Sequence, residues 1–174
     1  MHPSSMDNMR KARRKIESNL GTQLTILDVG GRDIKEGQDR SYRTIFNDVC
    51  QQYFIADING GPNVTHVMPG PYTLPFEDNS IDLIVCGQVL EHVKNPFRSV
   101  AEMKRVLKPG RFMILIAPSM GRAHDALDCW RFMPDAFKAI AEEVQLKVIG
   151  DWVDNWDPRD RSGHWADHTF IGQK

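Results

Sequence analysis

Apolar residues along the chain follow two spacings, one typical of buried strands and one typical of helices that pack on a sheet. Continuous apolar runs of strand length occur at "TILDVG", "YFIADI", "IDLIVC" and "RFMILIAP". Between and around these runs, apolar residues recur every three or four positions, which predicts helices over residues 7–19, 39–52, 95–107 and 134–144. Two further runs, "LKVIGDWV" and "HTFIGQ", predict strands near the end of the chain.

Each predicted helix has one apolar face whose members are predicted to be buried. These members are Met9, Ala12, Ile16 and Leu20 in the first helix, Tyr42, Ile45, Phe46 and Val49 in the second, Phe97, Val100, Met103, Val106 and Leu107 in the third, and Phe137, Ile140, Ala141 and Val144 in the fourth. "KPG" follows the third helix and predicts its end, because proline and glycine are common just beyond a helix C-terminus.

Strands that alternate with helices predict an α/β fold, namely a Rossmann-like, doubly wound, mostly parallel sheet with helices on both faces. One segment departs from this alternation. "NVTHVM" predicts a short third strand, although only "NGGP" separates it from the second. Because parallel neighbours usually need a crossover of about a dozen residues or more, either one crossover helix is missing here or the strand pairing is irregular.

The chain is predicted to form one domain over residues 1–174, with an N-terminal helix in 1–22 and a core in 23–174. Its 41% hydrophobic and 26% charged residues are typical of a globular protein. The formal net charge of −1 gives no general attraction to nucleic acid or to anionic membranes. Basic residues do gather in the first helix, but no aromatic residues are interleaved there for base stacking, so a solvated helix face is favoured over phosphate contacts.

Cysteine usage and the longest apolar runs bear on the cell compartment. The three cysteines are far apart and form no CxxC pair, which predicts neither a disulfide framework nor a zinc knuckle. No apolar run approaches the ~20 residues of a membrane span, and "MHPSSMDNMRKARRK" lacks the apolar core of a signal peptide. A reducing, cytoplasmic location without membrane attachment is expected.

Acidic residues and glycines stand where the first two strands are predicted to end. In "ILDVGGRD", Asp28 is followed by Gly30 and Gly31, so bare backbone lies where a ligand would approach. Asp57 ends the second strand, and a carboxylate there accepts hydrogen bonds from ribose hydroxyls in dinucleotide folds. A turn acid before "NGG" is the alternative. The full G-x-G-x-x-G cradle of a dehydrogenase is missing, which favours a nucleoside ligand without phosphates.

Four segments, "ILDVGG", "YFIADI", "LPFEDNSIDLIVCGQVLEHVKNPFRSVAEMKRVLKPGRFMILIAP" and "DCWRFMPDAF", together resemble class I S-adenosylmethionine-dependent methyltransferases. The resemblance runs from about Ile26 to Phe137, and its central block, "LPF…D…LEHV…RVLKPG", is far more specific than the glycine turn alone. It implies a seven-stranded type of sheet, S-adenosyl-L-methionine as the cofactor and methyl transfer as the activity.

The resemblance also implies which residues contact the cofactor. The first motif would pass beneath the methionine part, Asp57 would hold the ribose, and Tyr72 and Leu74 would flank the adenine. The implied cofactor-binding residues are Asp28, Gly30, Gly31, Arg32, Asp57, Ile58, Tyr72, Leu74, Gln88, Val89 and His92.

Two places depart from the family pattern. Arg32 and Asp33 replace the small residues that are common after the glycine turn. Gly70 stands where many relatives place an acid that takes the adenine amino group, and Pro71 beside it has no N–H. Adenine is then expected to rely on apolar contacts and on Tyr72.

Methyl transfer to a hydroxyl is helped by a general base, and histidine suits that role near neutral pH. His124, in the loop "SMGRAHDALDCWRF", is the preferred catalytic candidate, with Asp125 or Asp128 as the orienting acid. A solvent-exposed loop histidine is the alternative. Trp130 and Arg131 are candidates for the wall of the acceptor site, although Trp130 also fits a core aromatic whose N–H meets a carbonyl.

The tail "DPRDRSGHWADH" contains His164, Asp167 and His168, a spacing that would place two imidazoles on one helix face as in some metal sites. Pro158 and Gly163 favour a loop instead. No metal site is therefore expected.

The leading functional hypothesis is a methyltransferase that acts on an oxygen or nitrogen of a small-molecule acceptor, such as a sugar. A catalytically weak or inactive binding module with the same fold is the first alternative. An RNA or protein methyltransferase is the second, and the balanced charge disfavours a nucleic-acid substrate. The chain adds almost no cap over the cleft, so the site is expected to be open, or to be completed by a homodimer or a partner protein.

Overall fold

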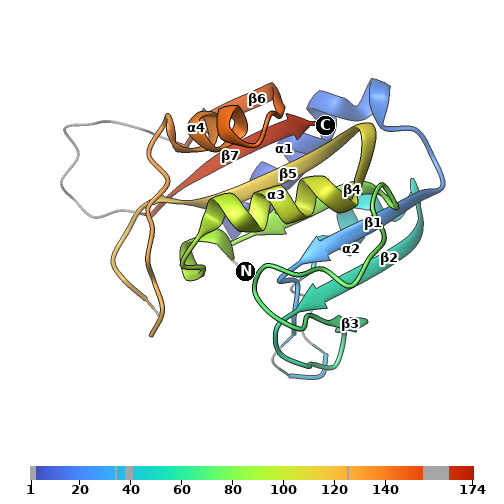
Figure 1. The fold of residues 1–174 in the computed structure, drawn as a ribbon, viewed down its shortest axis with the longest axis horizontal. Coiled ribbons are helices and arrows are strands. Elements are labelled where there is room, and N and C mark those ends of the chain that lie inside the picture. Colours follow the sequence, from blue (N-terminus) through green and yellow to red (C-terminus); the bar gives the residue numbers. More distant parts are fainter. Residues whose placement is uncertain (1–2, 34, 38–40, 125, 155–164) are drawn as a thin grey trace.

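Seven strands form one sheet in the order β3-β2-β1-β4-β5-β7-β6 (Figure 1). The strands are β1 (Leu24–Val29), β2 (Cys50–Asp57), β3 (His66–Val67), β4 (Ile81–Gly87), β5 (Leu107–Met120), β6 (Lys147–Val153) and β7 (Ala166–Gln173). The structure, a computed structural model, describes residues 3–33, 35–37, 41–124, 126–154 and 165–174. Within these residues, the strands from β3 to β5 run parallel, and β7 runs antiparallel to both of its neighbours.

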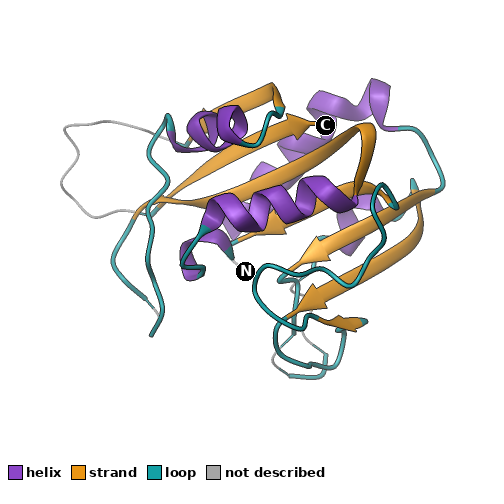
Figure 2. Cartoon of the chain, viewed as in Figure 1, coloured by secondary structure: helices purple, strands orange, loops and turns teal. Residues whose placement is uncertain are grey.

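Helices cover both faces of this sheet (Figure 2). They are α1 (Pro3–Leu20), α2 (Arg43–Phe46), α3 (Pro96–Val106) and α4 (Ala136–Glu143), with one 3₁₀ turn, η1 (Leu90–His92). Side chains of α1 and α2 belong to the core on one face, and those of α3 and α4 belong to the core on the other. The predicted α/β, Rossmann-like fold with a mostly parallel sheet is therefore confirmed.

Alternation along each strand divides the apolar residues between the two core layers. Ile26 packs in the layer of α1, whereas Leu27 packs in the layer of α3. Successive side chains of a strand point to opposite faces, so a strand covered on both sides must be apolar at nearly every position. This requirement explains why the central strands appear in the sequence as continuous apolar runs.

The short third strand lies where the sequence predicts it. β3 pairs in parallel with β2 through two residue pairs, Ala56 with His66 and Asp57 with Val67. Residues 58–65, which connect the two strands, contain no helix. Of the two alternatives, the loss of the crossover helix is therefore correct. The loop that replaces this helix lies at the carboxyl end of the sheet.

Two local predictions were wrong. The helix over 39–52 shrinks to α2, because Cys50 and the residues after it pair with β1 as part of β2. Phe97 is 40% exposed, because the buried face of α3 is set by Pro96, Ser99, Val100 and Met103. "KPG" ends the helix as expected but lies inside β5, at an irregularity in the pairing of β4 with β5.

Among the helices that the structure describes, none has the length and apolar composition needed to cross a membrane.

Candidate active site

The turn after β1 brings backbone against the segment that follows β4. Gly30 has a φ of +81°, and a Cβ added there would lie 2.1 Å from Cγ2 of Val89. The Gly30 N–H donates to the carbonyl of Ala56 on β2. Both the left-handed conformation and the close approach require glycine at this position.

Asp28 lies beneath this turn rather than beside a ligand. Its side chain is fully buried, and its Oδ2 accepts hydrogen bonds from the Tyr42 N–H at 3.0 Å and from the Tyr53 hydroxyl at 2.8 Å. A Cβ added at Gly31 would lie 2.5 Å from the Asp28 carboxyl carbon. Asp28 and Gly31 therefore support the turn from below and stay outside the pocket described next.

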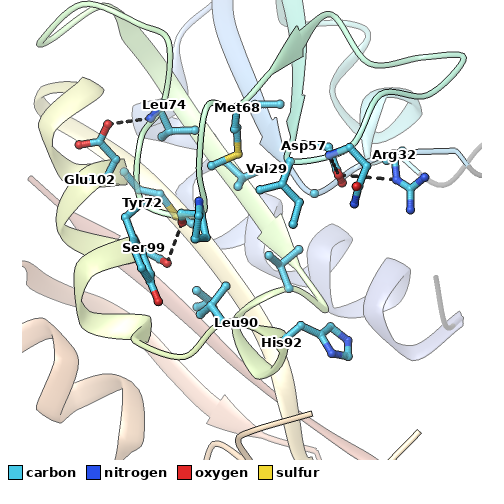
Figure 3. A pocket seen from close by; sticks show the side chains of 18 of the residues that line it. Val29, Arg32, Asp57, Met68, Tyr72, Leu74, Leu90, His92, Ser99 and Glu102 are labelled. Carbon is cyan, nitrogen blue, oxygen red and sulfur yellow. Dashed lines mark hydrogen bonds and ion pairs between the residues drawn. The ribbon is translucent and has the colours of Figure 1, made fainter. Parts of the chain in front are cut away.

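A pocket of about 500 Å³ opens at the carboxyl ends of β1, β2 and β4 (Figure 3). This volume is in the range typical of small-molecule sites. The predicted cofactor residues that line it are Gly30, Arg32, Asp57, Ile58, Tyr72, Leu74, Gln88, Val89 and His92. Further lining residues that sequence reasoning missed include Met68, Pro71, Ser99, Glu102, Met103 and Leu127. Most of the missed residues lie on α3 or on loops whose direction no local pattern indicates.

At one end of the pocket, Asp57 faces Arg32 from the neighbouring turn (Figure 3). Arg32 Nε lies 3.6 Å from Asp57 Oδ1, and the same oxygen accepts a hydrogen bond from the Asn59 N–H at 2.8 Å. The Arg32 stem packs against Gly61, where an added Cβ would lie 2.7 Å from Arg32 Cγ. The carboxylate is thus held at the pocket wall by a turn bond and an ion pair, with Oδ2 left for a ligand.

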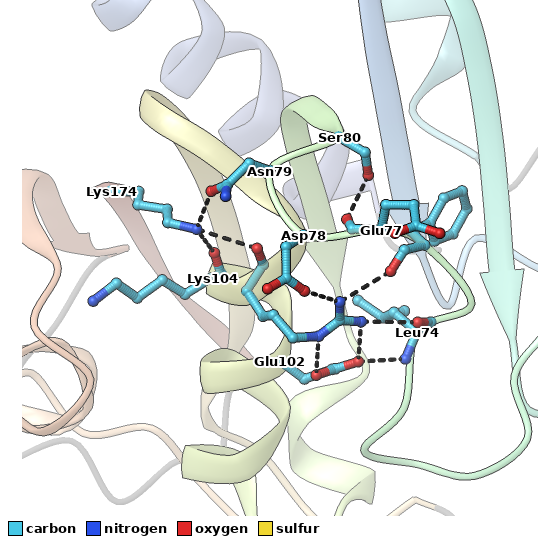
Figure 4. Close-up of polar contacts among 10 residues, drawn as sticks. Leu74, Glu77, Asp78, Asn79, Ser80, Glu102, Lys104 and Lys174 are labelled. Carbon is cyan, nitrogen blue, oxygen red and sulfur yellow. Dashed lines mark hydrogen bonds and ion pairs between the residues drawn. The ribbon is translucent and has the colours of Figure 1, made fainter.

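The other end is formed by the "LPF" segment, which α3 holds in place (Figure 4). Glu102 Oε1 accepts from the Leu74 N–H at 2.7 Å and from Arg105 Nη2 at 2.8 Å. Arg105 also donates to the carbonyls of Leu74 and Phe76 and to Asp78. The hydrogen bonds from Arg105 hold the pKa of Glu102 below its usual value. Through this network, Glu102 and Arg105 of "EMKR" hold the "LPFED" segment in place.

Tyr72 lies at the rim of the pocket. Its hydroxyl accepts a hydrogen bond from the Asn95 N–H at 3.1 Å, and the Arg98 guanidinium lies 4.6 Å from its ring centroid. Gly70, two residues earlier, has no heavy atom within 4 Å of an added Cβ. The space that an acid would occupy at position 70 is therefore open.

The predicted catalytic pair, His124 and Asp128, lies close to the pocket, in the loop after β5. His124 Nδ1 lies 3.0 Å from Asp128 Oδ2, whereas Asp125 lies outside the described residues. Arg131 also donates to both oxygens of Asp128, and these bonds hold the pKa of that carboxyl well below its usual range. The His124 ring packs edge-on against the His92 ring, with centroids 5.1 Å apart. His124 thus adjoins a residue of the pocket wall.

The two residues predicted for the acceptor wall, Trp130 and Arg131, lie outside the pocket. Arg131 donates to the carbonyls of Gly121 and Arg122 as well as to Asp128, so it fixes the shape of the loop. Trp130 is 41% exposed, and its Nε1–H donates to the Val93 carbonyl at 2.8 Å. Neither lines the pocket, and Trp130 is not a core aromatic.

Residues 23–115 match the family described as "Methyltransferase domain". This match covers more than half of the chain. The chain belongs to the methyltransferase domain family. The match confirms the resemblance on which the expected cofactor and activity rest.

Relatives of this methyltransferase domain differ in length and in stated activity. Among curated proteins, the ubiquinone/menaquinone biosynthesis C-methyltransferase UbiE of Pseudomonas putida (strain GB-1) is 28% identical over 129 residues, which are 71% of this chain and 44% of that protein. The chain spans less than half the length of this protein and of other curated relatives that it matches.

Solved structures share the fold at low identity. The YcgJ protein from Bacillus subtilis superposes with a TM-score of 0.70 at 16% identity and covers 99% of both chains. Burkholderia thailandensis 1,6-didemethyltoxoflavin-N1-methyltransferase, solved with 1,6-didemethyltoxoflavin and S-adenosylhomocysteine, gives a TM-score of 0.67 at 14% identity and covers 96% of this chain and 78% of that one. These likenesses confirm the fold of the methyltransferase domain.

The end of β4 carries a second buried network next to the pocket. Gln88 has a φ of +60°, and its Nε2 donates to Asp167 Oδ1 on β7 at 2.9 Å. The same oxygen accepts from Trp165 Nε1 at 3.0 Å, and Asp167 Oδ2 accepts from the Ser4 hydroxyl on α1 at 2.8 Å. Asp167 therefore ties α1 and β7 to the residue that follows β4.

His168 does not share one face of its strand with Asp167. His168 follows Asp167 on β7, so the two side chains point to opposite faces. His168 is buried between Asp151, 2.7 Å from Nε2, and the Phe132 carbonyl, 3.1 Å from Nδ1. His164 lies outside the described residues. The helical arrangement that would have joined these groups around a metal is replaced by a strand.

Glu91 is a buried acid that sequence reasoning did not single out. It is fully buried in η1, and burial raises the pKa of its carboxyl to about 8. Neither of its carboxylate oxygens has a hydrogen-bond partner among the residues that the structure describes. Its position in "LEHV", between two pocket residues, is the only sequence signal that would have pointed to it.

The pocket suits the cofactor that the family resemblance implies. A bare glycine turn, a carboxylate at the end of β2 and apolar side chains at Ile58, Met68 and Leu74 lie around one cavity. These are the features that an amino-acid tail, a ribose and an adenine need.

Proposed function

We propose that this domain binds S-adenosyl-L-methionine in the described pocket and transfers its methyl group to an oxygen or nitrogen of a small-molecule acceptor. The single observation that carries the proposal is the position of Asp57. Its carboxylate ends β2 at the wall of a cavity that Gly30, Val89 and apolar side chains also line. When bound, the cofactor would supply an electrophilic methyl group on a sulfonium.

Each part of the cofactor has residues suited to it. Asp57 would accept hydrogen bonds from the ribose hydroxyls. Ile58, Met68 and Leu74 would enclose the adenine, with Tyr72 at the rim. The turn at Gly30 lets the backbone approach the methionine part, and the Arg32 guanidinium offers a positive charge for its carboxylate. Asp28 acts indirectly, by holding the turn.

The acceptor side is proposed to lie at His92, Leu127 and His124. The Asp128 carboxylate orients the His124 ring through Nδ1, so that Nε2 is the atom that would take a proton from an acceptor hydroxyl. Alignment of the acceptor with the methyl group and exclusion of water would supply most of the rate. His124 is exposed in this loop, which favours a small acceptor or a site completed by a second protein.

Titration calorimetry with S-adenosylhomocysteine tests the cofactor step. Saturable one-to-one binding is expected, and Asp57→Asn should weaken it at least about tenfold, because hydrogen bonds to a charged acceptor are worth about 1.5–3 kcal/mol. Glu77→Gln removes an exposed carboxylate outside the pocket and serves as the matched control. An unchanged affinity in Asp57→Asn would contradict the proposed ribose contact.

A binding module without turnover is the second candidate, and the altered residues after the glycine turn favour it. A panel of hydroxyl and amine acceptors with radiolabelled S-adenosylmethionine distinguishes the two, with RNA and protein fractions run in parallel. Transfer to a small molecule that His124→Ala lowers at unchanged cofactor affinity supports the enzyme. Tight binding with no transfer to any acceptor supports the module.

The RNA reading is disfavoured by the partners of the basic helix. Arg10 pairs with Asp7 and Arg13 pairs with Asp48, while Lys11 lies 4.7 Å from the ring centroid of Trp152. These side chains already have protein partners. Salt-sensitive RNA binding that is lost on deletion of residues 1–19 would reverse this preference.

A further inference from the structure

We propose that Glu91, His92 and His124 form a binding site for one divalent transition-metal ion of the zinc type. Each residue offers a ligand atom, and the three atoms lie within 4.8 Å of one another. They come from two segments far apart in the sequence, η1 after β4 and the loop after β5. Metal binding at this place goes beyond methyl transfer and does not depend on it.

The two imidazoles are already oriented as metal ligands are. His92 Nδ1 lies 2.5 Å from the Leu127 carbonyl oxygen, which accepts only, so Nδ1 carries the proton. His124 Nδ1 lies 3.0 Å from Oδ2 of the Asp128 carboxylate, within ion-pair distance. Metal-binding histidines usually donate the other ring N–H to a carbonyl or a carboxylate, which leaves Nε2 with its lone pair for the ion. Both rings here place Nδ1 beside such an oxygen, the Leu127 carbonyl for His92 and the Asp128 carboxylate for His124.

Glu91 would supply the negative charge, releasing its proton to solvent when the ion binds. The Glu91 side chain is 0% accessible to solvent. Neither of its carboxylate oxygens has a hydrogen-bond partner among the described residues. His92 Nε2 lies 3.6 Å from Glu91 Oε1. A buried carboxylate without a partner is costly. An ion between Glu91 and the two imidazoles would satisfy it.

The loop that carries His124 is fixed against η1, so the site is built before an ion arrives. The Cys129 N–H donates to the Glu91 carbonyl at 2.7 Å, and Arg131 holds the loop through Asp128 and the Gly121 carbonyl. The Trp165 ring packs edge-on against His124, with centroids 5.1 Å apart. Such support from surrounding groups is what fixes the position of metal ligands.

The donor set decides which ions fit. Two imidazole nitrogens and one carboxylate are the ligands of many zinc sites and of other late first-row ions, and they leave a coordination position open. Magnesium and calcium prefer oxygen ligands and keep water instead. We therefore expect zinc to bind and magnesium not to compete with it.

The open position would lie beside the proposed acceptor side, because His92 lines the pocket together with Leu127. An ion there would hold an acceptor hydroxyl and lower its pKa, so that the hydroxyl proton is released to solvent. His124 Nε2 would then bind the ion instead of acting as a base. Zinc loading should accordingly change acceptor turnover without changing cofactor affinity.

The test is zinc binding to untagged protein stripped with EDTA. Addition of ZnCl₂ should raise the melting temperature, and calorimetry should give one ion per chain; MgCl₂ should do neither. Glu91→Gln and His124→Ala should each lose the zinc-dependent rise and weaken zinc binding at least about tenfold, since changes around metal ligands cost about that much or more. His124→Ala alters an exposed loop residue, so its fold is retained even if Glu91→Gln unfolds.

Cys129→Ser is the matched control, because Cys129 is an exposed thiol next to the proposed ligands. It should bind zinc as the unmodified protein does. No zinc binding, or binding that Cys129→Ser abolishes and His124→Ala leaves intact, would overturn the proposal. S-adenosylhomocysteine titrations on the same samples separate this failure from failure of the proposed function, because loss of cofactor binding concerns only the latter.

Discussion

The Asp28 carboxyl group lies directly beneath Gly31, so that a Cβ added at Gly31 would be 2.5 Å from the Asp28 carboxyl carbon. The acid near the end of β1 and the glycine that follows the strand are therefore packed against each other. Asp28 also accepts hydrogen bonds from Tyr42 and Tyr53, which lie on two different segments. An acid that looks like a ligand contact in the sequence is, in the fold, an acceptor that holds the glycine turn.

Asp28→Ala should therefore act on stability. It leaves the buried Tyr53 hydroxyl and the Tyr42 N–H without their acceptor, which we expect to cost about 3 kcal/mol. Asp57→Ala removes a carboxylate at the pocket wall and should cost less than about 1 kcal/mol. Urea unfolding of both variants measures the difference. Equal losses of unfolding free energy would contradict the separate roles given to the two acids.

Gly30→Ala tests the contact with Val89. The substitution introduces a side chain at a φ of +81° and a clash 2.1 Å from Val89 Cγ2. Gly37→Ala is the matched control, because Gly37 has a φ of +77° and no heavy atom within 4 Å of an added Cβ. Both should lose about 1–2 kcal/mol for the left-handed backbone.

Only Gly30→Ala should lose stability beyond that amount and also weaken S-adenosylhomocysteine binding, because Val89 lines the pocket. Thermal unfolding and calorimetry on the two variants give both quantities. If Gly37→Ala were as damaging as Gly30→Ala, backbone strain alone would explain the effect and the contact would be unimportant.

The position of Asp57 could be predicted from the sequence, whereas the direction of Asp28 could not. Parallel strands end at one edge of a sheet, so an acid that ends an apolar run must lie at that edge. Whether its side chain points into the cleft depends on the alternation of the strand and on partners such as Tyr53, which is 25 residues away. The same limit explains why Glu91 was missed, since nothing in "LEHV" indicates how deeply it is buried.

Residues from α3 show a second limit of prediction. Met103 was placed on the buried face of its helix by its spacing, and it is buried. That Ser99 and Glu102 also line the pocket depends on how "LPFED" folds across the helix, which Arg105 determines through its hydrogen bonds. Spacing predicts a face, but the partner of that face comes from long-range contacts.

Gly70→Asp is expected to strengthen cofactor binding. The family resemblance implies an acid at this position, and here an added Cβ would meet no heavy atom within 4 Å. A carboxylate there would accept a hydrogen bond from the adenine amino group, which should improve the affinity for S-adenosylhomocysteine about three- to tenfold. That ligand carries no sulfonium charge, so the gain would not come from simple charge attraction.

Gly70→Ala is the control for the loss of glycine flexibility, and it should leave the affinity unchanged. Calorimetry on the two variants decides the matter. Equal affinities in Gly70→Asp, Gly70→Ala and the unmodified protein would show that the adenine does not lie beside this position.

Glu102→Gln is expected to lower stability at neutral pH but not in acid. Hydrogen bonds from Arg105 lower the pKa of Glu102 in the folded protein, so the carboxylate contributes stability above the pKa of the unfolded chain, about 4.3. That contribution is lost as the pH falls through the folded pKa, because both states then bind the proton. The variant should be about 1–2 kcal/mol less stable at pH 7, and this difference should shrink below about pH 4.

Urea unfolding across that pH range measures the difference in stability. Glu77→Gln is the control, and its difference from the unmodified protein should stay small throughout. A deficit in Glu102→Gln that persisted unchanged at low pH would mean that shape, and not charge, links the helix to the "LPF" segment.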